Sequence, residues 1–458
     1  MNSKTADVII VGAGLTGLSM AWFLQEEGKK VFLLEKEKKT GGVINTVSEK
    51  GFTFETGPNT GVLSTPEIAN LFLELKDFCR LATANPKSKK RYILKRGKWQ
   101  PLPSGLLSGI TTPLFTFNDK LRLLGEPFRK PGADPDESVA QLVIRRMGSS
   151  FLDYAVDPFI SGIYAGDPEK LITRYALPKL YNLEQNYGSF IKGAIKKAKE
   201  PKTDAQKRAT GEVFSVEGGL GSLIKALNQK IGIENIFTDA QDNFISPVAG
   251  GYNVSLTHSG ETLTLTAPVV VTTTGGYGLP ELLPFISPVK LKPITDLHYA
   301  GIVQAALGYN VWRGIKPDAF GGLIPSKERR EILGILFPSA IFGGRAPETG
   351  ALLSVFLGGV KRPAMISKSD EELREIVLRE TGEMMSNSDL PDLFKIYRYS
   401  HAIPQYEKST GERLECIKSL QDQYPGLILA GNIRDGIGMA DRVKQAKHIS
   451  DLITGHER

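Results

Sequence analysis

Six consecutive residues near the start of the chain, Gly12-Ala13-Gly14-Leu15-Thr16-Gly17, have the types and spacing of a loop that binds a pyrophosphate. The first glycine permits a tight turn, the second lets the backbone approach the anion, and the third lets a helix pack closely on a strand. Glu35 follows at the usual spacing and can accept a hydrogen bond from a ribose hydroxyl. Because its carboxylate would repel a 2′-phosphate, the loop is expected to bind FAD or NAD rather than NADP.

The residues around this loop predict the elements that must position it. Residues 8–11 are a β-branched run typical of a buried parallel strand, and apolar residues recur at helical spacing over 15–25. Gly28 ends this helix, and a second strand over 30–34 leads into Glu35. A glycine loop alone is also found in ordinary turns, but strand, helix and acid in this order predict a Rossmann-like nucleotide-binding domain.

Two later segments favour FAD as the nucleotide. Gly41-Gly42 follows the acid closely, and residues 51–59 read Gly-Phe-Thr-Phe-Glu-Thr-Gly-Pro-Asn. These segments resemble the entry segment of the flavin amine oxidase superfamily, in which the glycine pair lies along the cofactor and the later turn passes beside the flavin ring. In addition to the loop, the resemblance implies that FAD contacts Glu35, Lys36, Gly41, Gly42, Gly57, Pro58, Asn59 and Thr60.

Length and composition limit the class of protein. A chain of 458 residues exceeds what one hydrophobic core usually holds, so two or three domains are expected. The 57 basic and 50 acidic residues give a net charge of +7 that is spread along the chain, which favours an anionic partner without naming one. Cys79 and Cys416 are far apart, with no histidine or cysteine at ligand spacing, so no disulfide framework and no metal site is predicted. The sequence has no uninterrupted apolar run of about 18 residues, so a membrane-spanning helix is not expected.

The rest of the chain predicts that the α/β nucleotide-binding domain is joined by a mixed-sheet substrate domain and a helical insert. The fold class expected is α/β, and the whole chain would be α+β. A hairpin is expected over 91–102, and from 103 to about 199 helical patterns replace strand patterns. The charged stretch 196–210 is expected to be a mobile linker. Strands are expected at 251–257, 262–267, 269–274, 302–309, 321–324, 334–337 and 351–357, and helices at 66–75, 119–124, 136–147, 184–199 and 370–386.

Two further glycine turns have different interpretations. Gly275-Gly276-Tyr277-Gly278 follows a strand, but Pro280 comes too soon for a helix to receive a phosphate there, so a second nucleotide site is not expected. The turn after the buried strand 427–432 leads into a helix over 439–454, whose N-terminus would stabilise negative charge on a reduced flavin. Gly431, Asn432, Gly438 and Met439 are therefore predicted to contact the cofactor.

The middle of the chain resembles one family within that superfamily. Residues 157–168 read Asp-Pro-Phe-Ile-Ser-Gly-Ile-Tyr-Ala-Gly-Asp-Pro and look like the signature of the oxygen-dependent protoporphyrinogen oxidases. Further matching motifs, spread over essentially the whole chain, are Arg91-Tyr92, Glu126-Pro127-Phe128, 214–219, 323–326, 334–337, 355–359 and 430–432. The resemblance implies an FAD-binding domain built from 1–83, 214–290 and 402–458, a substrate domain built from 84–105, 200–213 and 291–401, and a membrane-associating helical insert over 106–199.

The same resemblance implies the residues that hold the substrate. Arg91 falls where the family pairs an arginine with a substrate propionate, and Gly162 where a backbone carbonyl faces the pyrrole N–H groups. Leu323 and Leu336 fall on residues that pack one face of the tetrapyrrole, and Phe356 on the aromatic residue that packs the other. Without the motifs, each apolar residue would be read as core and the arginine as solvated.

The activity implied is the FAD-dependent oxidation of protoporphyrinogen IX to protoporphyrin IX by dioxygen in heme biosynthesis. Coproporphyrinogen III is the alternative substrate, and a flavin amine oxidase or a non-catalytic escort protein are the remaining alternatives. The FAD is expected to be non-covalent, because neither cysteine lies in a flavin-contacting motif. A cytoplasmic protein is expected, with peripheral membrane contact through Leu106-Leu107 and residues 110–117. A second copy of the chain is a predicted partner, and a nucleic acid is not.

Overall fold

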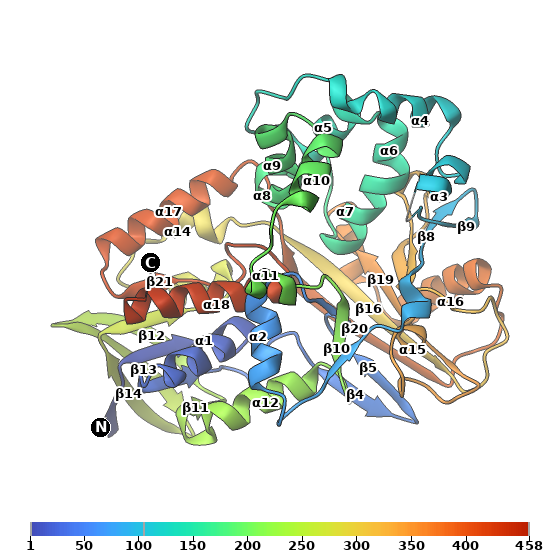
Figure 1. Ribbon diagram of the computed structural model, residues 1–458. Coiled ribbons are helices and arrows are strands. Elements are labelled where there is room, and N and C mark those ends of the chain that lie inside the picture. The colour runs from blue at the N-terminus through green and yellow to red at the C-terminus, as the bar shows by residue number, and fades with distance from the viewer. Residues whose placement is uncertain (1, 104–105, 457–458) are drawn as a thin grey trace.

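The computed structural model describes residues 2–103 and 106–456, so the last two residues of the predicted segment 84–105 lie outside it. The fold is mixed α/β (Figure 1). A parallel sheet with helices, a larger mixed sheet and a group of helices form three parts of the molecule. No helix of the described residues is long and apolar enough to cross a membrane.

A five-stranded parallel sheet organises the nucleotide-binding part. Its strands, in the order β11-β3-β2-β15-β21, are Ile236–Phe237, Val31–Leu34, Val8–Val11, Val269–Thr272 and Leu427–Leu429. Three segments that are distant in the sequence therefore meet in one sheet. Val8 and Ile10 point to the side of helices α1 (Leu15–Glu26) and α18 (Met439–Thr454), whereas Ile9 and Val11 point to the opposite core.

A second sheet of four strands covers that opposite side. Its order is β1-β14-β13-β12, formed by Asn2–Thr5, Glu261–Ala267, Gly251–His258 and Gln241–Val248. The predicted strands 251–257 and 262–267 are confirmed, but β1 and β12 are not among the predicted strands. Both lack the pattern of a buried strand: β1 is short and polar, and most of β12 is solvent-exposed.

The larger mixed sheet has seven strands in the order β20-β16-β19-β18-β17-β8-β9. They are Leu393–Pro404, Tyr299–Tyr309, Ala351–Gly358, Ile332–Leu336, Gly321–Leu323, Arg91–Lys95 and Lys98–Pro101. Neighbouring strands are antiparallel except β17 and β8, which are parallel. Helix α16 (Asp370–Met385) packs on one face through Leu373 and Val377.

The helical insert, residues 106–199, contains helices and no named strand among its described residues (Figure 1). Its helices are α3 (Leu106–Thr111), α4 (Phe117–Leu124), α5 (Val139–Arg146), α6 (Ser149–Phe151), α7 (Asp157–Ile163), α8 (Thr173–Ala176), α9 (Pro178–Tyr187) and α10 (Phe190–Lys199). The single helix predicted over 184–199 is wrong. Gly188 adopts φ +72°, which ends α9, and the Ser189 side chain caps α10.

Two other expectations for this region need correction. Leu114 and Phe115 are buried rather than part of an apolar surface, and Phe115 stacks on Phe151 with ring centroids 4.0 Å apart. The structure does not describe the side chains of Leu106, Leu107 and Ile110, which belong to the same predicted surface. The stretch 196–210 is not irregular throughout, since α10 reaches Lys199 and a further helix, α11, follows.

The remaining helices and strands connect these parts. They are β4 (Thr46–Glu49), β5 (Phe52–Glu55), β6 (Gly61–Val62), α2 (Pro66–Glu74), β7 (Leu81–Thr83), α11 (Asp204–Arg208), β10 (Val213–Val216), α12 (Gly221–Ile231), α13 (Leu279–Leu282), α14 (Pro288–Thr295), α15 (Pro338–Ile341) and α17 (Thr410–Gln423).

Candidate active site

The glycine loop follows directly on the carboxyl end of β2, between that strand and α1. A Cβ atom on Gly17 would lie 2.0 Å from the carbonyl oxygen of Gly12, so only a glycine allows this approach of helix and strand. A Cβ atom on Gly14, by contrast, would meet no atom within 4 Å. The loop is therefore tightly packed at its third glycine and open at its second, as a pyrophosphate cradle requires.

Glu35 lies beside this loop at the end of β3. One carboxylate oxygen accepts a hydrogen bond from the Ala13 N–H at 3.0 Å, and the other accepts one from the Glu37 N–H at 3.0 Å. Burial raises the pKa of Glu35, although the two backbone hydrogen bonds oppose that shift. The structure thus brings the predicted ribose acceptor to the loop, and the neighbouring Lys36 side chain is exposed.

The predicted glycine pair joins the loop to the segment that is expected to pass beside the flavin. The Gly41 N–H donates to the Ala13 carbonyl at 2.7 Å, and a Cβ atom on Gly42 would lie 3.5 Å from the Gly14 Cα. Gly57 packs so closely on the same stretch that its Cβ would lie 2.0 Å from the Val43 carbonyl oxygen. Pro58 and Thr60 beside it are half-buried.

The last strand-turn-helix approaches the loop through Thr273. The Thr273 hydroxyl donates to the Gly12 carbonyl at 2.7 Å, and a Cβ atom on Gly431 would lie 2.6 Å from the Thr273 carbonyl oxygen. Asn432 follows Gly431, and Met439 begins α18 after Gly438. Thr273 therefore connects Gly431 to the glycine loop, and the contacts of Asn432, Gly438 and Met439 with the cofactor stay a prediction.

Arg442 fixes the backbone of this turn, and its role was not predicted from the sequence. Its buried guanidinium group donates to the carbonyl oxygens of Arg434 at 2.8 Å, Asp435 at 2.7 Å and Gly436 at 2.8 Å, and also to that of Gly431. Burial lowers the pKa of Arg442. The only signal in the sequence is an arginine on the buried face of the last helix.

The predicted substrate residues of the mixed sheet share one face. Arg91, Gly321, Leu336 and Ser354 pair across β8, β17, β18 and β19, and Ile93, Leu323, Gly334 and Phe356 form the next row. Their neighbours along each strand, such as Leu94, Ile335 and Val355, point to the core beneath α16. The face that carries the predicted residues, here called the substrate face, therefore lies opposite α16.

Gly162 and a glycine of the sheet shape this substrate face. Gly162 on α7 packs against it, since a Cβ atom there would lie 2.4 Å from Cδ2 of Leu323. Gly334 lies between Leu323 and Phe356 in their row and has no side chain. The Leu323 side chain extends over Gly334, because its Cδ2 atom lies 3.3 Å from the position of a Cβ atom there, and it fills the space between Gly334 and Gly162.

The cofactor segment and the substrate face are in direct contact. The Ser354 hydroxyl donates to the side-chain oxygen of Asn59 at 2.9 Å. The Gln304 side chain on neighbouring β16 donates to the Glu55 carbonyl at 2.8 Å. A molecule held on the substrate face would therefore lie next to the turn that contains Gly57, Pro58 and Asn59.

The predicted propionate partner, Arg91, is exposed. Its guanidinium carbon lies 5.2 Å from the centre of the Phe320 ring, at the first residue of β8. Leu323, Leu336 and Phe356 are half-buried. The structure thus brings these predicted positions together on one face, with the charged group at its edge.

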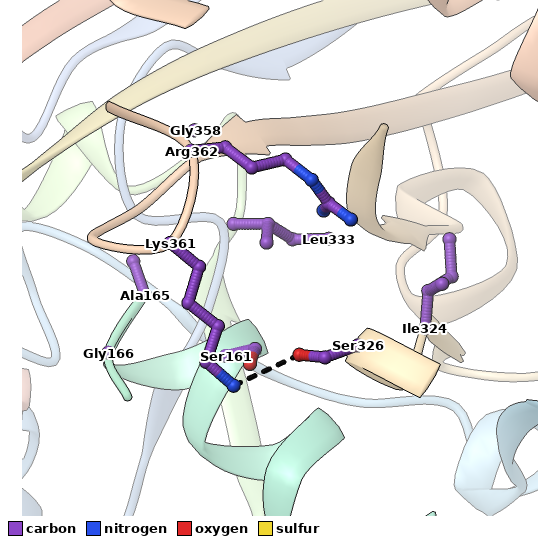
Figure 2. A pocket seen from close by; sticks show the side chains of 9 residues that line it. All are labelled: Ser161, Ala165, Gly166, Ile324, Ser326, Leu333, Gly358, Lys361 and Arg362. Atoms are coloured by element: carbon purple, nitrogen blue, oxygen red, sulfur yellow. Dashed lines mark hydrogen bonds between the residues drawn. The ribbon is translucent and has the colours of Figure 1, made fainter. Parts of the chain in front are cut away.

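A cavity of about 210 Å³ lies at another edge of the same face, beside α7 (Figure 2). Its walls include Ser161 and Leu333, the neighbours of Gly162 and Gly334, together with Gly358 at the end of β19. Lys361 and Arg362 follow Gly358 and also line it. The cavity was not predicted from the sequence.

Comparison with known proteins identifies the family. Residues 15–448 match the family described as flavin containing amine oxidoreductase. The chain belongs to that family. This oxidoreductase is 30% identical to protoporphyrinogen oxidase 1 of Arabidopsis thaliana, over 96% of this chain and 87% of the relative. It is 26% identical to coproporphyrinogen III oxidase of Bacillus subtilis, over 99% of both chains.

A solved structure has the same fold as this flavin-containing oxidoreductase. A putative protoporphyrinogen oxidase from Exiguobacterium superposes with a TM-score of 0.81 over 100% of both chains, at 24% sequence identity. Family membership implies a flavin cofactor, and the residues present fit one. The open space at Gly14, the carboxylate at Glu35 and the glycine approaches at Gly42 and Gly57 are the features that a bound dinucleotide requires.

Proposed function

We propose that this flavoprotein oxidises protoporphyrinogen IX to protoporphyrin IX, with FAD as cofactor and dioxygen as the final acceptor. The observation that carries the proposal is the hydrogen bond between Ser354 and Asn59, since it joins the substrate face to the segment expected beside the flavin. Leu323, Leu336 and Phe356 give this face apolar side chains that suit a flat ring system. The similarity to protoporphyrinogen oxidase 1 over nearly the whole chain supports the same substrate.

The proposed roles of the residues follow from the shape of the substrate. Leu323 and Leu336 would contact one face of the tetrapyrrole, Phe356 the other, and Arg91 a propionate. The Gly162 carbonyl would accept a pyrrole N–H. FAD, when bound, supplies a two-electron acceptor, and formation of the aromatic ring favours loss of hydride from a bridging carbon. The chain therefore acts mainly by placement.

The reaction has a stoichiometry that tests the proposal. Conversion of a porphyrinogen to a porphyrin removes six hydrogens, so each porphyrin requires three molecules of dioxygen and yields three of hydrogen peroxide. Oxygen uptake and porphyrin fluorescence, measured together with purified protein and protoporphyrinogen IX, should give this ratio. Porphyrin formation no faster than in buffer alone would contradict the proposal.

Coproporphyrinogen III is the second candidate substrate, and one observation favours it. This molecule carries propionates on all four rings, whereas protoporphyrinogen IX carries two on neighbouring rings. Arg362 lines the cavity at the edge of the substrate face, away from Arg91, and could meet an additional carboxylate there. The 26% identity to the coproporphyrinogen III oxidase of Bacillus subtilis is in keeping with this alternative.

We expect the FAD to be non-covalent. Neither Cys79, which is buried in the core around α1, nor Cys416 on α17 lies in a predicted cofactor segment. Precipitation with acid should therefore leave the yellow colour in the supernatant. Colour that remains in the washed pellet would show a covalent link.

Replacing Arg91 with alanine should weaken porphyrinogen binding by about 1.5 to 3 kcal/mol, or one to two decades, and leave the flavin spectrum unchanged. Apolar side chains can hold the faces of a disc but cannot fix its rotation, which decides the carbon that is oxidised. A guanidinium group can fix it through two parallel hydrogen bonds to a carboxylate. Arg91→Lys should recover only part of the loss, because an ammonium group lacks this geometry.

Phe356→Ala is the control for Arg91→Ala. It removes contact with the ring but not with the carboxylate, so it should also weaken binding of a substrate whose propionates are esterified. The Arg91 variant should bind that ester as well as the unaltered protein does. Normal steady-state kinetics of Arg91→Ala with the free acid would show that the arginine is only a solvated residue.

We also propose peripheral membrane contact, now through α4 rather than through Leu114 and Phe115. Three apolar side chains of α4 are exposed at helical spacing, namely Phe117 (73%), Leu121 (49%) and Leu124 (68%), and Phe128 (85%) is exposed in the 3-10 turn that follows. Replacing the first three with serine should reduce flotation with anionic liposomes. The same replacement at the exposed residues Ile233, Val289 and Leu390 should not. Equal flotation of both triple variants would exclude α4 as the contact.

The other expectations stay predictions. They are the boundaries between the FAD-binding domain, the substrate domain and the insert, the pairing of two copies of the chain, and a cytoplasmic location.

A further inference from the structure

Arg362 presents an uncompensated charge to the cavity at the edge of the substrate face. The guanidinium group extends past Leu333, whereas the neighbouring Lys361 runs to Ser326 (Figure 2). Lys361 is neutralised by Asp157, with its Nζ atom 2.6 Å from a carboxylate oxygen. Within residues 2–103 and 106–456, no hydrogen bond or ion pair reaches the half-buried side chain of Arg362.

Ser161 provides a second polar group without a partner. Its side chain is 4% exposed and lines the same cavity, yet the Oγ atom makes no hydrogen bond within the described chain. A buried hydroxyl normally has a hydrogen-bond partner, because burying one without a partner costs free energy. A hydroxyl and a guanidinium group that both lack partners and share one cavity together favour an anionic oxygen ligand.

The backbone holds Arg362 in place. The Val360 N–H donates to the Ala165 carbonyl at 2.8 Å, which ties the loop after β19 to the end of α7. The Arg362 N–H donates to the Gly359 carbonyl at 3.1 Å, and Gly359 adopts φ +77°. The arginine therefore belongs to a defined turn rather than to a solvated loop.

The size of the cavity limits what it can take. At about 210 Å³ it is smaller than the roughly 300 to 1,000 Å³ of pockets that enclose a whole ligand. A propionate arm has five non-hydrogen atoms and fits this space, whereas a tetrapyrrole does not. The cavity therefore suits an arm of a ligand whose ring lies on the substrate face.

The cavity and Arg91 lie at diagonally opposite corners of that face. Arg91 is in the same row as Ser354, three strands away, and Gly358 is four residues further along β19. Three strand spacings of about 4.8 Å and four rises of about 3.3 Å place the backbones of Arg91 and Gly358 roughly 19 Å apart. The two positions are therefore far enough apart to hold two different carboxylates of one tetrapyrrole.

We propose that Arg362 and Ser161 form a second carboxylate site, which holds a propionate on the edge of the porphyrinogen remote from Arg91. The inference rests on the proposed oxidation of a porphyrinogen and specifies its substrate class. A porphyrinogen with a carboxylate on every ring can use both sites, whereas protoporphyrinogen IX has no carboxylate on two of its rings. The second site therefore supports the second candidate substrate, coproporphyrinogen III, against the protoporphyrinogen IX of the leading proposal.

Equilibrium binding to the holoenzyme tests this site with two fluorescent porphyrins. Coproporphyrin III has a carboxylate on every ring, and mesoporphyrin IX has two on neighbouring rings. Arg362→Gln should weaken coproporphyrin III binding roughly 10- to 100-fold and change mesoporphyrin IX binding less than about twofold. Arg362→Lys should lose less than Arg362→Gln, because it keeps the charge.

Arg329→Gln is the matched control, because Arg329 is an exposed arginine near the cavity that does not line it. It should leave both affinities unchanged, and melting curves should show that both variants are folded. If Arg362→Gln weakens the binding of both porphyrins equally, or weakens the binding of neither, the second site is wrong. A holoenzyme that oxidises no porphyrinogen would instead overturn the proposed function, whatever the binding assay shows.

Discussion

Replacing Arg146 with methionine should lower the free energy of unfolding of the helical insert by about 3 to 5 kcal/mol. The Arg146 and Glu126 side chains are both 0% exposed, and Nη2 of the arginine lies 2.6 Å from a carboxylate oxygen of Glu126. Its Nε atom lies 3.2 Å from a carboxylate oxygen of Glu184, which is 1% exposed. Removal of the arginine would leave the two buried carboxylates without its positive charge. Removing one partner of a buried ion pair is strongly destabilising, because the remaining charge stays buried and unpaired.

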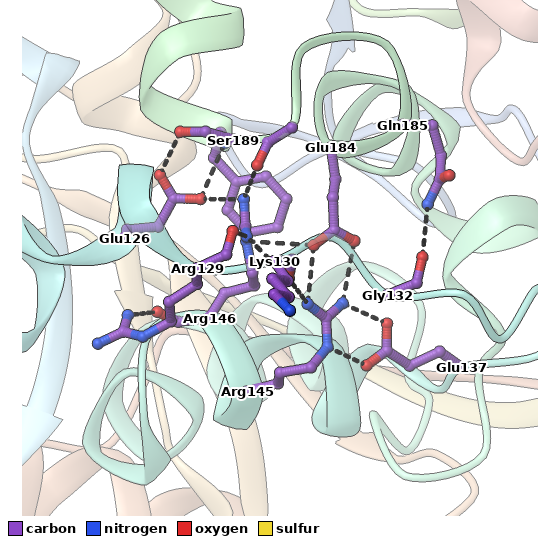
Figure 3. A network of polar contacts seen from close by, with 12 residues as sticks. Glu126, Arg129, Lys130, Gly132, Glu137, Arg145, Arg146, Glu184, Gln185 and Ser189 are labelled. Atoms are coloured by element: carbon purple, nitrogen blue, oxygen red, sulfur yellow. Dashed lines mark hydrogen bonds and ion pairs between the residues drawn. The ribbon is translucent and has the colours of Figure 1, made fainter.

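These side chains belong to a network that joins the helices of the insert (Figure 3). Glu126 also accepts hydrogen bonds from the Ser189 hydroxyl at 2.6 Å and the Phe190 N–H at 3.0 Å, so it fixes the start of α10. Burial alone would raise the pKa of Glu126, but these hydrogen bonds and the charge of Arg146 outweigh it and lower the pKa below 4.5. The stabilisation is therefore complete above pH 4.5 and is lost as the pH falls through the lowered pKa.

Limited proteolysis and thermal unfolding measure this effect. Cleavage of Arg146→Met should begin within residues 106–199 at a temperature at which the unaltered protein is resistant. Lys199→Met is the control, because it removes one positive charge from an exposed position of the same insert. If both variants unfold alike, the buried network does not hold the insert together.

Gly17→Ala should yield a protein that purifies without flavin. The new Cβ atom would lie 2.0 Å from the Gly12 carbonyl oxygen, closer than Cβ atoms are found, so the loop must move away from α1. Such a movement displaces the N–H groups that would bind the pyrophosphate and increases the distance between Glu35 and the cofactor. The ratio of flavin absorbance to protein absorbance after purification measures the loss.

Gly278→Ala is the matched control for Gly17→Ala. Gly278 belongs to the second glycine turn, has φ −89°, and a Cβ atom there would meet nothing within 4 Å. The variant should therefore keep its full flavin content. A Gly17→Ala protein with normal flavin, or a Gly278→Ala protein without it, would show that the nucleotide site has been assigned to the wrong turn.

The parts of the fold that sequence predicts well are those with a local pattern. Helix α18 begins and ends at the predicted residues, and α1 extends one residue beyond its predicted end. The break between α9 and α10 has a local signal in Gly188-Ser189, but the apolar and basic pattern across it favours one helix. What fixes the break is Glu126, which is distant in the sequence and caps α10 from outside.

The parts that sequence does not predict depend on pairing between distant segments. β20 is twelve residues long, but most of its side chains are half-buried or exposed and only its first and last residues are buried, so it has no clear apolar face. The substrate residues could be named only by motif, because their common face results from the pairing of β8, β17, β18 and β19. The cavity beside Arg362 requires in addition that α7 packs on that sheet.

The central claim is that a porphyrinogen on the substrate face reduces a flavin held by the glycine loop. Its most direct test is the flavin spectrum of the purified holoenzyme during one anaerobic cycle. Addition of protoporphyrinogen IX or coproporphyrinogen III without oxygen should bleach the flavin band, and admission of air should restore it as porphyrin fluorescence appears. A flavin band that keeps its full absorbance with both porphyrinogens, while dithionite bleaches it, would contradict the account.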